Sequence, residues 1–394
     1  MNAQQISTGI LSALMACTGG AIMIITASER FGFSSAALIS WLFIVYVVGG
    51  AMNLWLALKY KIPFAGAHSI TAAAFLSTSA AQASLPQLAG SYIMAGALVA
   101  LLGFTGVFHK LLELIPRPLI DAMLAGLILH YVADIVPVFQ EAPLVAALSI
   151  LGFFIAPKLS KALPPLLGVL LFGLAGLLIV HKFPAIAPTA FSLPQLVMPS
   201  FSVTGFFSLA LPLAVLVLSN DLAVALAALK KNGFEPPANK AVAASGLGTA
   251  FAGLFGGQAI NIGGMMTALC SSEEAGDKPG RYKAAVVSSV LVMAFGFFAW
   301  KFIAIIQLLP DYFIAMLTGF SLVGVLLGSL QAAFKETSYK YSILFAFVIS
   351  ISNVSFFGIS SAVWSLLIGT IAAKLLKEGN SVQQAPQNTL NSAG

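Results

Sequence analysis

The chain has 394 residues, of which 59% are hydrophobic and only 8% are charged. Soluble domains carry about 25% charged residues, so this composition excludes a soluble globular protein, which needs more polar surface. The formal net charge of +6 does not indicate nucleic-acid binding, because the basic residues sit in short loops and form no patch. The two cysteines, Cys17 and Cys270, lie in apolar segments and provide neither a disulfide framework nor metal-ligand spacing. We therefore expect an all-α integral membrane protein without a metal or cofactor.

Twelve apolar segments are candidates for full-length membrane-spanning helices, which need about 20 apolar residues. They are residues 8–27, 36–58, 88–108, 117–136, 142–157, 164–181, 205–229, 239–256, 284–306, 311–331, 339–355 and 358–377. No positive residues precede the first segment, so we expect it to stay in the mature protein rather than act as a cleaved signal. Two further segments, 64–79 and 259–272, are apolar but short and rich in Gly, Ala, Ser or Thr. Counted as discontinuous spans 3 and 10, they bring the total to fourteen.

The basic residues favour this count of fourteen. If the N-terminus is cytoplasmic, 16 of the 19 Lys and Arg residues fall on the cytoplasmic side, and only Arg30, Lys182 and Lys301 fall on the other. This is the asymmetry that the positive-inside rule requires. Omitting both short segments would place the next basic cluster outside. We predict a multi-pass protein of the inner (plasma) membrane with both termini in the cytoplasm.

The two halves of the chain resemble each other. The sequence AMLAG at residues 122–126 recurs as AMLTG at 315–319, each at a similar distance after a proline. Phe31-Gly32-Phe33 likewise has a counterpart in Asn232-Gly233-Phe234, so the common offset is roughly 193 to 201 residues. Because each half would hold seven spans, an odd number, the second half must be inverted relative to the first. This 7+7 inverted repeat is the plan of many secondary transporters.

The two short segments predict an anion site in the middle of the membrane. Gly66 tolerates close backbone approach, and a helix can begin near His68, while Gly263-Gly264 opens the second helix. Helix starts offer free amides and a positive dipole end, which together bind anions. Broken backbone at this depth is tolerated only inside protein or against a wet cavity. The alternative is that both segments are Gly-rich packing helices.

Ionisable side chains inside spans are costly and are therefore functional candidates. Asp221 lies in the middle of its span with no Lys or Arg beside it, and it would act as a proton site that is protonated when substrate loads. The alternative for Asp221 is a structural carboxyl hydrogen-bonded to broken backbone. His68 would be neutral and donate to the substrate, or it would be a satisfied packing histidine. Asp121 and His130 lie nine residues apart on one span, and we expect Asp121 to be wet.

The remaining polar candidates complete a pocket around these helix starts. The predicted substrate-binding residues are Thr18, Gly66, Ala67, His68, Ser69, Asn220, Gln258, Asn261, Ile262, Gly263 and Gly264, and the predicted proton-coupling residue is Asp221.

At these residues the sequence resembles the benzoate–proton symporter (BenE) family, within the larger group of nucleobase permeases and sulfate and bicarbonate carriers. The resemblance covers most of the chain. It is carried by the stretch from Ile115-Pro116 through AMLAG, the run ALPLAVLVLSND, and the run AINIGGMMTALC followed by SSEEAGDKPGRYKAA. It implies a substrate bound between spans 3, 10 and 8, and a possible homodimer.

The resemblance also implies a division into two domains. A core domain would comprise residues 1–111 (spans 1–4) and 205–306 (spans 8–11), and a gate domain residues 112–182 (spans 5–7) and 307–378 (spans 12–14). Residues 183–204 would form an inter-repeat loop, and residues 379–394 a disordered polar tail.

One motif separates this chain from the nucleobase permeases. Asn261-Ile262-Gly263 matches their Asn-x-Gly signature, but Ile260 stands where those permeases typically have Gln, Glu or Pro, and Thr267 is out of register. The departures argue against a nucleobase and fit a simpler anion. Either Asn220 or Asp221 would occupy the position of the permeases' substrate-binding Glu.

We therefore expect a secondary transporter that couples proton movement to uptake of benzoate or a related aromatic carboxylate by alternating access. The amides of residues 66–69 and 261–264 would hold the carboxylate. The alternatives are a carrier of another small organic or inorganic anion, and a passive anion channel. An intramembrane enzyme is not expected, because the sequence has no HExxH, Gly-x-Ser-x-Gly or metal-spaced cluster.

Overall fold

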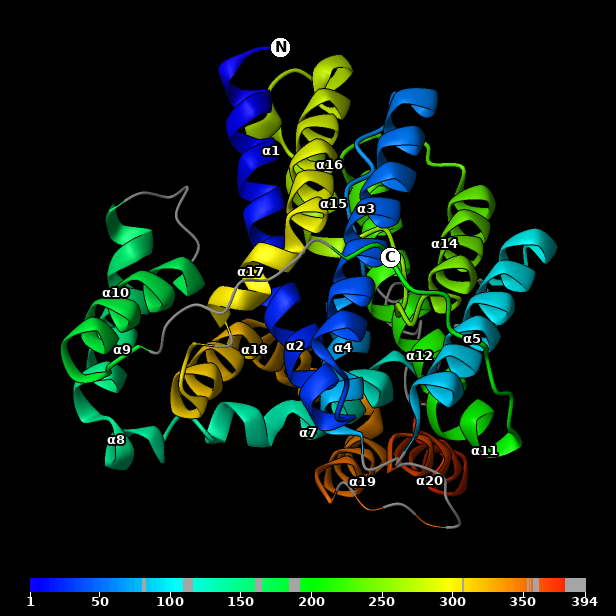
Figure 1. Ribbon diagram of the computed structural model, residues 1–394. Coiled ribbons are helices and arrows are strands. Elements are labelled where there is room, and N and C mark those ends of the chain that lie inside the picture. The colour runs from blue at the N-terminus through cyan, green and yellow to red at the C-terminus, as the bar shows by residue number, and fades with distance from the viewer. Residues whose placement is uncertain are drawn as a thin grey trace, which may run out of the picture.

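The computed structural model describes residues 1–79, 83–108, 116–159, 165–183, 192–306, 308–352, 354, 356 and 361–379. Within these residues the regular elements are helices, and His68 and Ile260 form an isolated antiparallel bridge (Figure 1). Residues 380–394, which were expected to form most of the polar tail, lie outside the described residues, as does 184–191 of the expected inter-repeat loop.

Each of the twelve predicted full-length segments contains a helix, as predicted. The helices are α1 (Ala3–Met15), α2 (Ala21–Arg30), α3 (Ser35–Tyr60), α5 (Leu85–Thr105), α7 (Arg117–Ala133), α8 (Val138–Glu141), α9 (Pro143–Leu159), α10 (Pro165–Val180), α11 (Val203–Gly205), α12 (Leu211–Leu216), α13 (Ala223–Lys231), α14 (Ala238–Gly253), α16 (Tyr282–Phe297), α17 (Ala299–Ile306), α18 (Asp311–Phe334), α19 (Lys340–Ile351) and α20 (Ser361–Leu375). Six helical runs in the described part of the chain are long and apolar enough to cross a membrane, judged by length and composition.

One predicted span is divided in the structure. Residues 284–306 were expected to form one helix, but α16 ends at Phe297 and α17 begins at Ala299. Gly296 lies one residue before the end of α16, where its missing side chain lets the helix pack against Tyr46 of α3. Glycine is a poor helix former, so the residue that permits this close approach also weakens the helix at the point where it breaks.

Two long helical runs are interrupted by π-helical turns. The run from α1 to α2 contains η1 (Ala16–Gly20), and the run from α11 to α13 contains η2 (Phe206–Ala210) and η3 (Val217–Leu222). Single π turns shift the helical register locally and occur frequently at functional sites. The predicted site residues Thr18, Asn220 and Asp221 all lie in these turns.

The ends of α2 and α13, which carry the matching tripeptides, share the same local geometry. Gly32 has a φ of +66° and Gly233 a φ of +79°, a left-handed conformation that glycine adopts without strain. The amide of Phe33 donates to the Ser28 carbonyl, and the amide of Phe234 donates in the same way to Leu229. Both ends therefore carry the same glycine cap, at equivalent places in the two halves of the chain.

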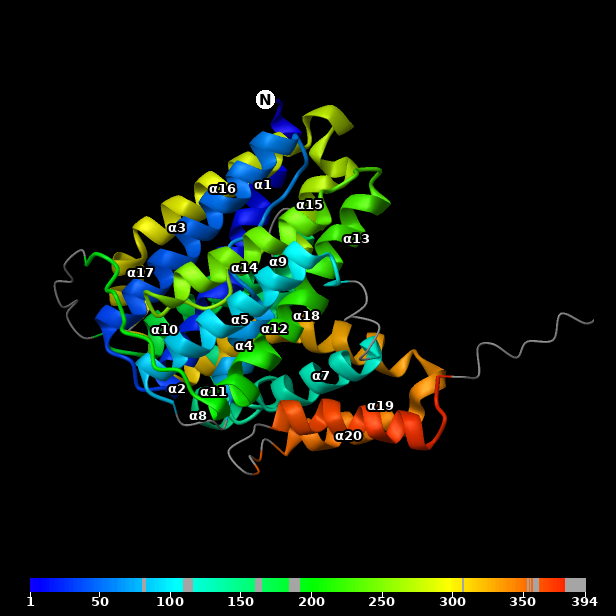
Figure 2. The same cartoon turned by 90° about the vertical axis from the view of Figure 1, so that its right-hand side faces the viewer.

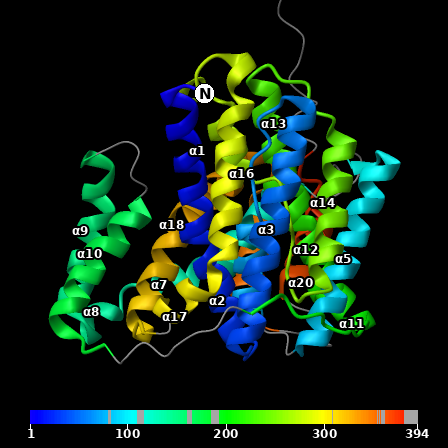
Figure 3. The same cartoon turned by 45° about the horizontal axis from the view of Figure 1, so that its top comes forward.

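Helix packing joins the two halves of the chain. α3 pairs with α16 and α5 pairs with α14, while α1 also packs against α16. Figure 3 shows these helices running side by side. A second group is formed by α7, α18, α19 and α20, and α9 and α10 pair with each other at its edge.

The two short apolar segments contain α4 (Ile70–Thr78) and α15 (Gly264–Ser271). α15 begins at the predicted glycine pair, whereas α4 begins two residues after His68. The chain segments before them run antiparallel and cross each other. The amide of Ser69 donates to Ala259 O (3.0 Å), that of Asn261 to Ala67 O (3.0 Å) and that of Gly263 to Ala65 O (2.9 Å). From this crossover α15 and α4 run in different directions, α15 in the upper and α4 in the lower part of Figure 2. Their first turns therefore converge.

Glycine at position 66 makes the crossover possible. A Cβ there would lie within 2.5 Å of the Asn261 carbonyl oxygen, and closer still to the Gly263 amide nitrogen. Both neighbours are backbone atoms that are held by hydrogen bonds, so neither can move without breaking the crossover.

We therefore predict that Gly66→Ala destabilises the protein by about 1–3 kcal/mol, the usual cost of overpacking a well-packed interior. Thermal unfolding in detergent, followed by size-exclusion chromatography, measures the effect. Gly324→Ala is the matched control, because a Cβ at Gly324 meets nothing within 4 Å. A Gly66→Ala variant as stable as the control would contradict this account of the crossover.

Candidate functional site

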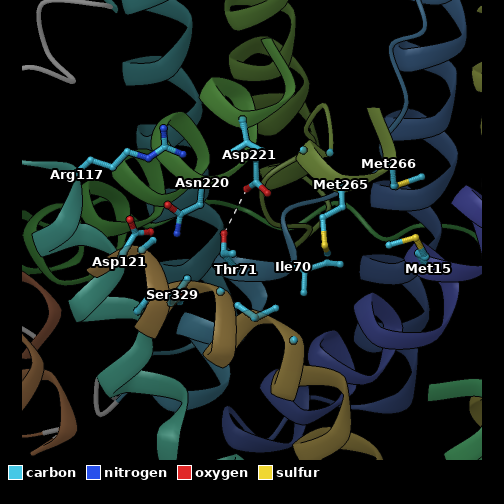
Figure 4. Close-up of a pocket in the computed structure, with 18 of the residues that line it drawn as sticks. Met15, Ile70, Thr71, Arg117, Asp121, Asn220, Asp221, Met265, Met266 and Ser329 are labelled. Carbon is cyan, nitrogen blue, oxygen red and sulfur yellow. Dashed lines mark hydrogen bonds between the residues drawn. The ribbon is translucent and has the colours of Figure 1, made fainter. Parts of the chain in front are cut away.

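A cavity of about 700 Å³ lies where the first turns of α4 and α15 converge (Figure 4). Besides these two helices, the cavity walls come from η3 with the start of α13, from the end of α1, and from α7 and α18. A cavity of this size falls in the range that small-molecule sites occupy, about 300–1,000 Å³. The helix starts therefore border a space large enough for a small organic ligand.

Asp221 lines this cavity and is only 8% exposed. The Ser69 hydroxyl donates a hydrogen bond of 2.5 Å to Asp221 Oδ2, and the Thr71 hydroxyl donates one of 3.3 Å to the same oxygen. Ser69 is also the N-cap of α4, where its side chain accepts from the amide of Ala72 (3.0 Å). The carboxyl on η3 is thus connected directly to the start of α4, through hydroxyl groups rather than through a cation.

The two ring nitrogens of His68 are both within hydrogen-bonding distance of neighbours. Nε2 lies 3.1 Å from the Tyr46 hydroxyl, and Nδ1 lies 3.3 Å from Gln258 Nε2. Since Tyr46 donates to Ala16 O (2.7 Å), its oxygen accepts from Nε2–H, while Gln258 donates to Nδ1. His68 lines the cavity, but this network leaves it no spare donor, as expected of a satisfied packing histidine.

Some of the backbone amides predicted to bind the substrate already donate hydrogen bonds within the protein. The amides of Ser69, Asn261 and Gly263 are used in the crossover, and that of Ile262 donates to Asn261 Oδ1 (2.8 Å). The first turn of a helix has amides without an intrahelical partner. In α4 these include the amides of residues 70–71, and in α15 those of residues 264–266, all of which line the cavity. Of the amides that are left without an intrahelical partner, that of Gly264 was among the predicted donors, whereas those of residues 70–71 and 265–266 lie just after the predicted ranges.

The predicted substrate-binding residues divide into two groups. His68, Asn220, Gly263 and Gly264 line the cavity together with Asp221. The others do not line the cavity: Thr18, Gly66, Ala67, Ser69, Gln258, Asn261 and Ile262. Thr18 donates to Leu14 O (2.7 Å) within its own helix, and Gln258 donates to Ser69 O (3.1 Å).

Sequence reasoning missed several cavity residues. Thr71 was not singled out, although it follows Ser69 by two residues at a predicted helix start. Asp121 was expected to be wet and was not assigned to the site, but it lines the cavity from α7 with 9% of its surface exposed (Figure 4). Arg117, one helical turn earlier, also lines the cavity, whereas the surface of His130 is exposed. The four-residue spacing of Arg117 and Asp121 places both on one face of a helix, and this was the sequence signal that could have identified them.

The chain matches one protein family along nearly its whole length. The model of the benzoate membrane transport protein family (BenE) matches residues 1–375. The benzoate membrane transport protein of Acinetobacter baylyi is 29% identical over 371 residues, which cover 93% of this chain and 94% of that protein. The inner membrane protein YdcO of Escherichia coli is also 29% identical, over 374 residues and the same shares.

Solved structures share the fold at low sequence identity. The transmembrane domain of the cyanobacterium bicarbonate transporter BicA aligns with a TM-score of 0.61 at 15% identity, covering 95% of this chain and 98% of that one. SLC26A9 aligns with a TM-score of 0.64 at 13% identity, covering 94% of this chain and 65% of that one. Together with the apolar helices, these matches identify an all-helical, multi-pass membrane transport protein rather than an enzyme. The chain belongs to the family of benzoate membrane transport proteins.

Proposed function

We propose that the protein imports benzoate or a closely related aromatic carboxylate together with a proton, across the inner membrane, by alternating access. The observation that carries this proposal is the position of Asp221. Its carboxyl lines the cavity and accepts hydrogen bonds from Ser69 and Thr71 at the start of α4. The family and the Acinetobacter baylyi relative support a carboxylate as the substrate.

Electrostatic repulsion between the Asp221 carboxylate and the substrate would couple the movement of the proton to that of the substrate anion. The free amides at the starts of α4 and α15 favour an anion, but an ionised Asp221 beside them would repel it. Two carboxylates that share a site of low dielectric do not both ionise. Substrate therefore binds best when Asp221 is protonated, and the protonated carboxyl and the anion cross together.

The proposed architecture is a 7+7 inverted repeat of fourteen spans. Its core domain comprises residues 1–111 and 205–306, and its gate domain residues 112–182 and 307–378. The paired helices α3–α16 and α5–α14 and the repeated caps after α2 and α13 support this plan. The cavity then lies between the two domains, because α4, α15 and η3 belong to the core and α7 and α18 to the gate. Association into a homodimer remains a prediction.

The cavity reaches Arg117, Lys335 and Glu336, which lie at the cytoplasmic end in the predicted topology. This is the arrangement of an inward-facing state. Hydrogen bonds from core to gate hold the opposite end together. The Tyr131 hydroxyl on α7 donates to Ser77 O on α4, and the hydroxyls of Thr26 and Thr318 lie 3.2 Å apart.

Counterflow in proteoliposomes tests the substrate. Labelled benzoate is expected to exchange, with saturation, much faster than in empty liposomes. Exchange no faster than in empty liposomes would remove benzoate as the substrate, and flux that never saturates would favour a passive anion channel. If inorganic anions compete with labelled benzoate for exchange, the result would favour a carrier of another small anion.

We predict that Asp221→Asn keeps benzoate exchange but abolishes accumulation driven by an inward proton gradient, because the amide cannot take up or release the proton. Uptake with and without a pH gradient measures this. Asp277→Asn, at an exposed loop position outside the cavity, is the matched control and should accumulate normally. Full pH-driven accumulation by Asp221→Asn would exclude Asp221 as the coupling residue.

We predict that Tyr131→Phe shifts the protein toward the outward-facing state, since it deletes a hydrogen bond that closes the outer end. A hydrogen bond worth about 1 kcal/mol changes the ratio of states about fivefold. The readout is labelling of Ala315→Cys by a membrane-impermeant maleimide, in a background of Cys17→Ala and Cys270→Ala. Ala315 lines a separate chamber of about 200 Å³ beside Tyr131.

Faster labelling from outside is the expected result. The control is Tyr341→Phe, because the Tyr341 side chain is exposed and the residue follows Lys340 at the cytoplasmic end in the predicted topology. Equal labelling rates in Tyr131→Phe and in the control would show that the Tyr131 hydrogen bond does not hold the outer end closed.

A further inference from the structure

Among the large apolar side chains in the described part of the chain that line the cavity, Met265 has an unusually bare surface. Met265 is 54% exposed, although α15 starts inside the protein at the crossover, and Met265 lines the cavity. Its neighbour Met266 lines the same cavity but is only 7% exposed. The bare surface of Met265 is therefore turned into the cavity and not toward another helix.

The surroundings of Met265 are apolar. Figure 4 shows the Met265 side chain directed toward Ile70, with the Met15 side chain reaching toward the same region from α1. Arg117 and Asp121 lie on the other side of Asp221 in this view. The cavity is therefore divided into a polar part near α7 and a part lined by thioether and aliphatic groups near α1 and α4.

Bare apolar surface in a wet cavity favours a ligand that covers it, by roughly 25 cal/mol per Å² of surface removed from water. Thioether groups also make favourable contacts with aromatic rings. The backbone of Met265 belongs to the first turn of α15, where amides are free to bind an anion. A single residue thus offers a donor for a carboxylate and an apolar surface for a group attached to it.

We propose that Met265 determines specificity for aromatic carboxylates. Its thioether, together with Met15 and Ile70, forms a platform that covers the ring of the substrate while the first-turn amides of α15 hold the carboxylate. This inference rests on the proposed function, because it takes an aromatic carboxylate as the ligand. Short aliphatic carboxylates reach the amides but leave the platform uncovered, and so they bind more weakly.

Equilibrium binding of labelled benzoate to purified, detergent-solubilised protein tests the proposal. Met265→Gln keeps the length of the side chain but makes it polar, and its Kd for benzoate is expected to rise about tenfold, or about 1.4 kcal/mol. Met265→Leu stays apolar and should bind benzoate nearly as well as the wild-type protein. Met15→Gln should weaken benzoate binding in the same direction. The dissociation constant of acetate, measured by its displacement of labelled benzoate, should be the same in every variant.

The matched control is Met198→Gln, because Met198 is 86% exposed and does not line the cavity; its Kd should equal that of the wild-type protein. If the wild-type protein binds benzoate and both Met265→Gln and Met15→Gln bind it equally well, the platform is wrong while the proposed function stands. If the wild-type protein binds no benzoate, the proposed function fails and the platform fails with it. Size-exclusion chromatography of each variant shows that loss of binding is not loss of folding.

Discussion

Backbone hydrogen bonds between residues 65–69 and 259–263 hold two interrupted chain segments across each other in the interior of the molecule. An interrupted backbone buried among apolar helices is costly unless its polar groups are paired. Here each segment satisfies the other, and Thr267 adds a side-chain bond by donating to Ala65 O (2.9 Å). The crossover leaves the amides of residues 70–71 in α4 and 264–266 in α15 without an intrahelical partner. The cavity lies at these amides, so the site exists because the crossover is complete.

The same arrangement explains why a carboxyl is placed where an anion is expected to bind. Asp221 lies in a π turn of a helical run that packs between α4 and α15, and it meets Ser69 and Thr71 from the first of these helices. Hydroxyl donors stabilise a carboxyl without neutralising its charge, unlike a salt bridge to Lys or Arg. The charge of Asp221 therefore remains available to oppose or permit an anion at the helix starts, which is the basis of the proposed coupling.

Much of this architecture could be predicted from the sequence, because it follows from local chemistry. Apolar length predicted the helices, and the glycines at 32 and 233 predicted two equivalent helix ends. The break at Phe298 could not be predicted, because it depends on how Gly296 packs against α3. The role of His68 depends on partners remote in the sequence, because Tyr46 and Gln258 occupy its ring nitrogens, and no sequence period encodes that pairing. For Asp121 the sequence held a local signal, its four-residue spacing from Arg117, but that spacing alone does not show that this face of α7 borders the cavity.

The position of the ligand itself decides between this account and its rivals. A structure of the protein with benzoate bound, determined by electron cryo-microscopy in a lipid nanodisc, would locate the carboxylate directly. The account predicts that the carboxylate lies within hydrogen-bonding distance of the first-turn amides of α15 or α4, beside Asp221. Benzoate held instead at Arg117 and Lys335, with the helix starts unoccupied, would contradict it.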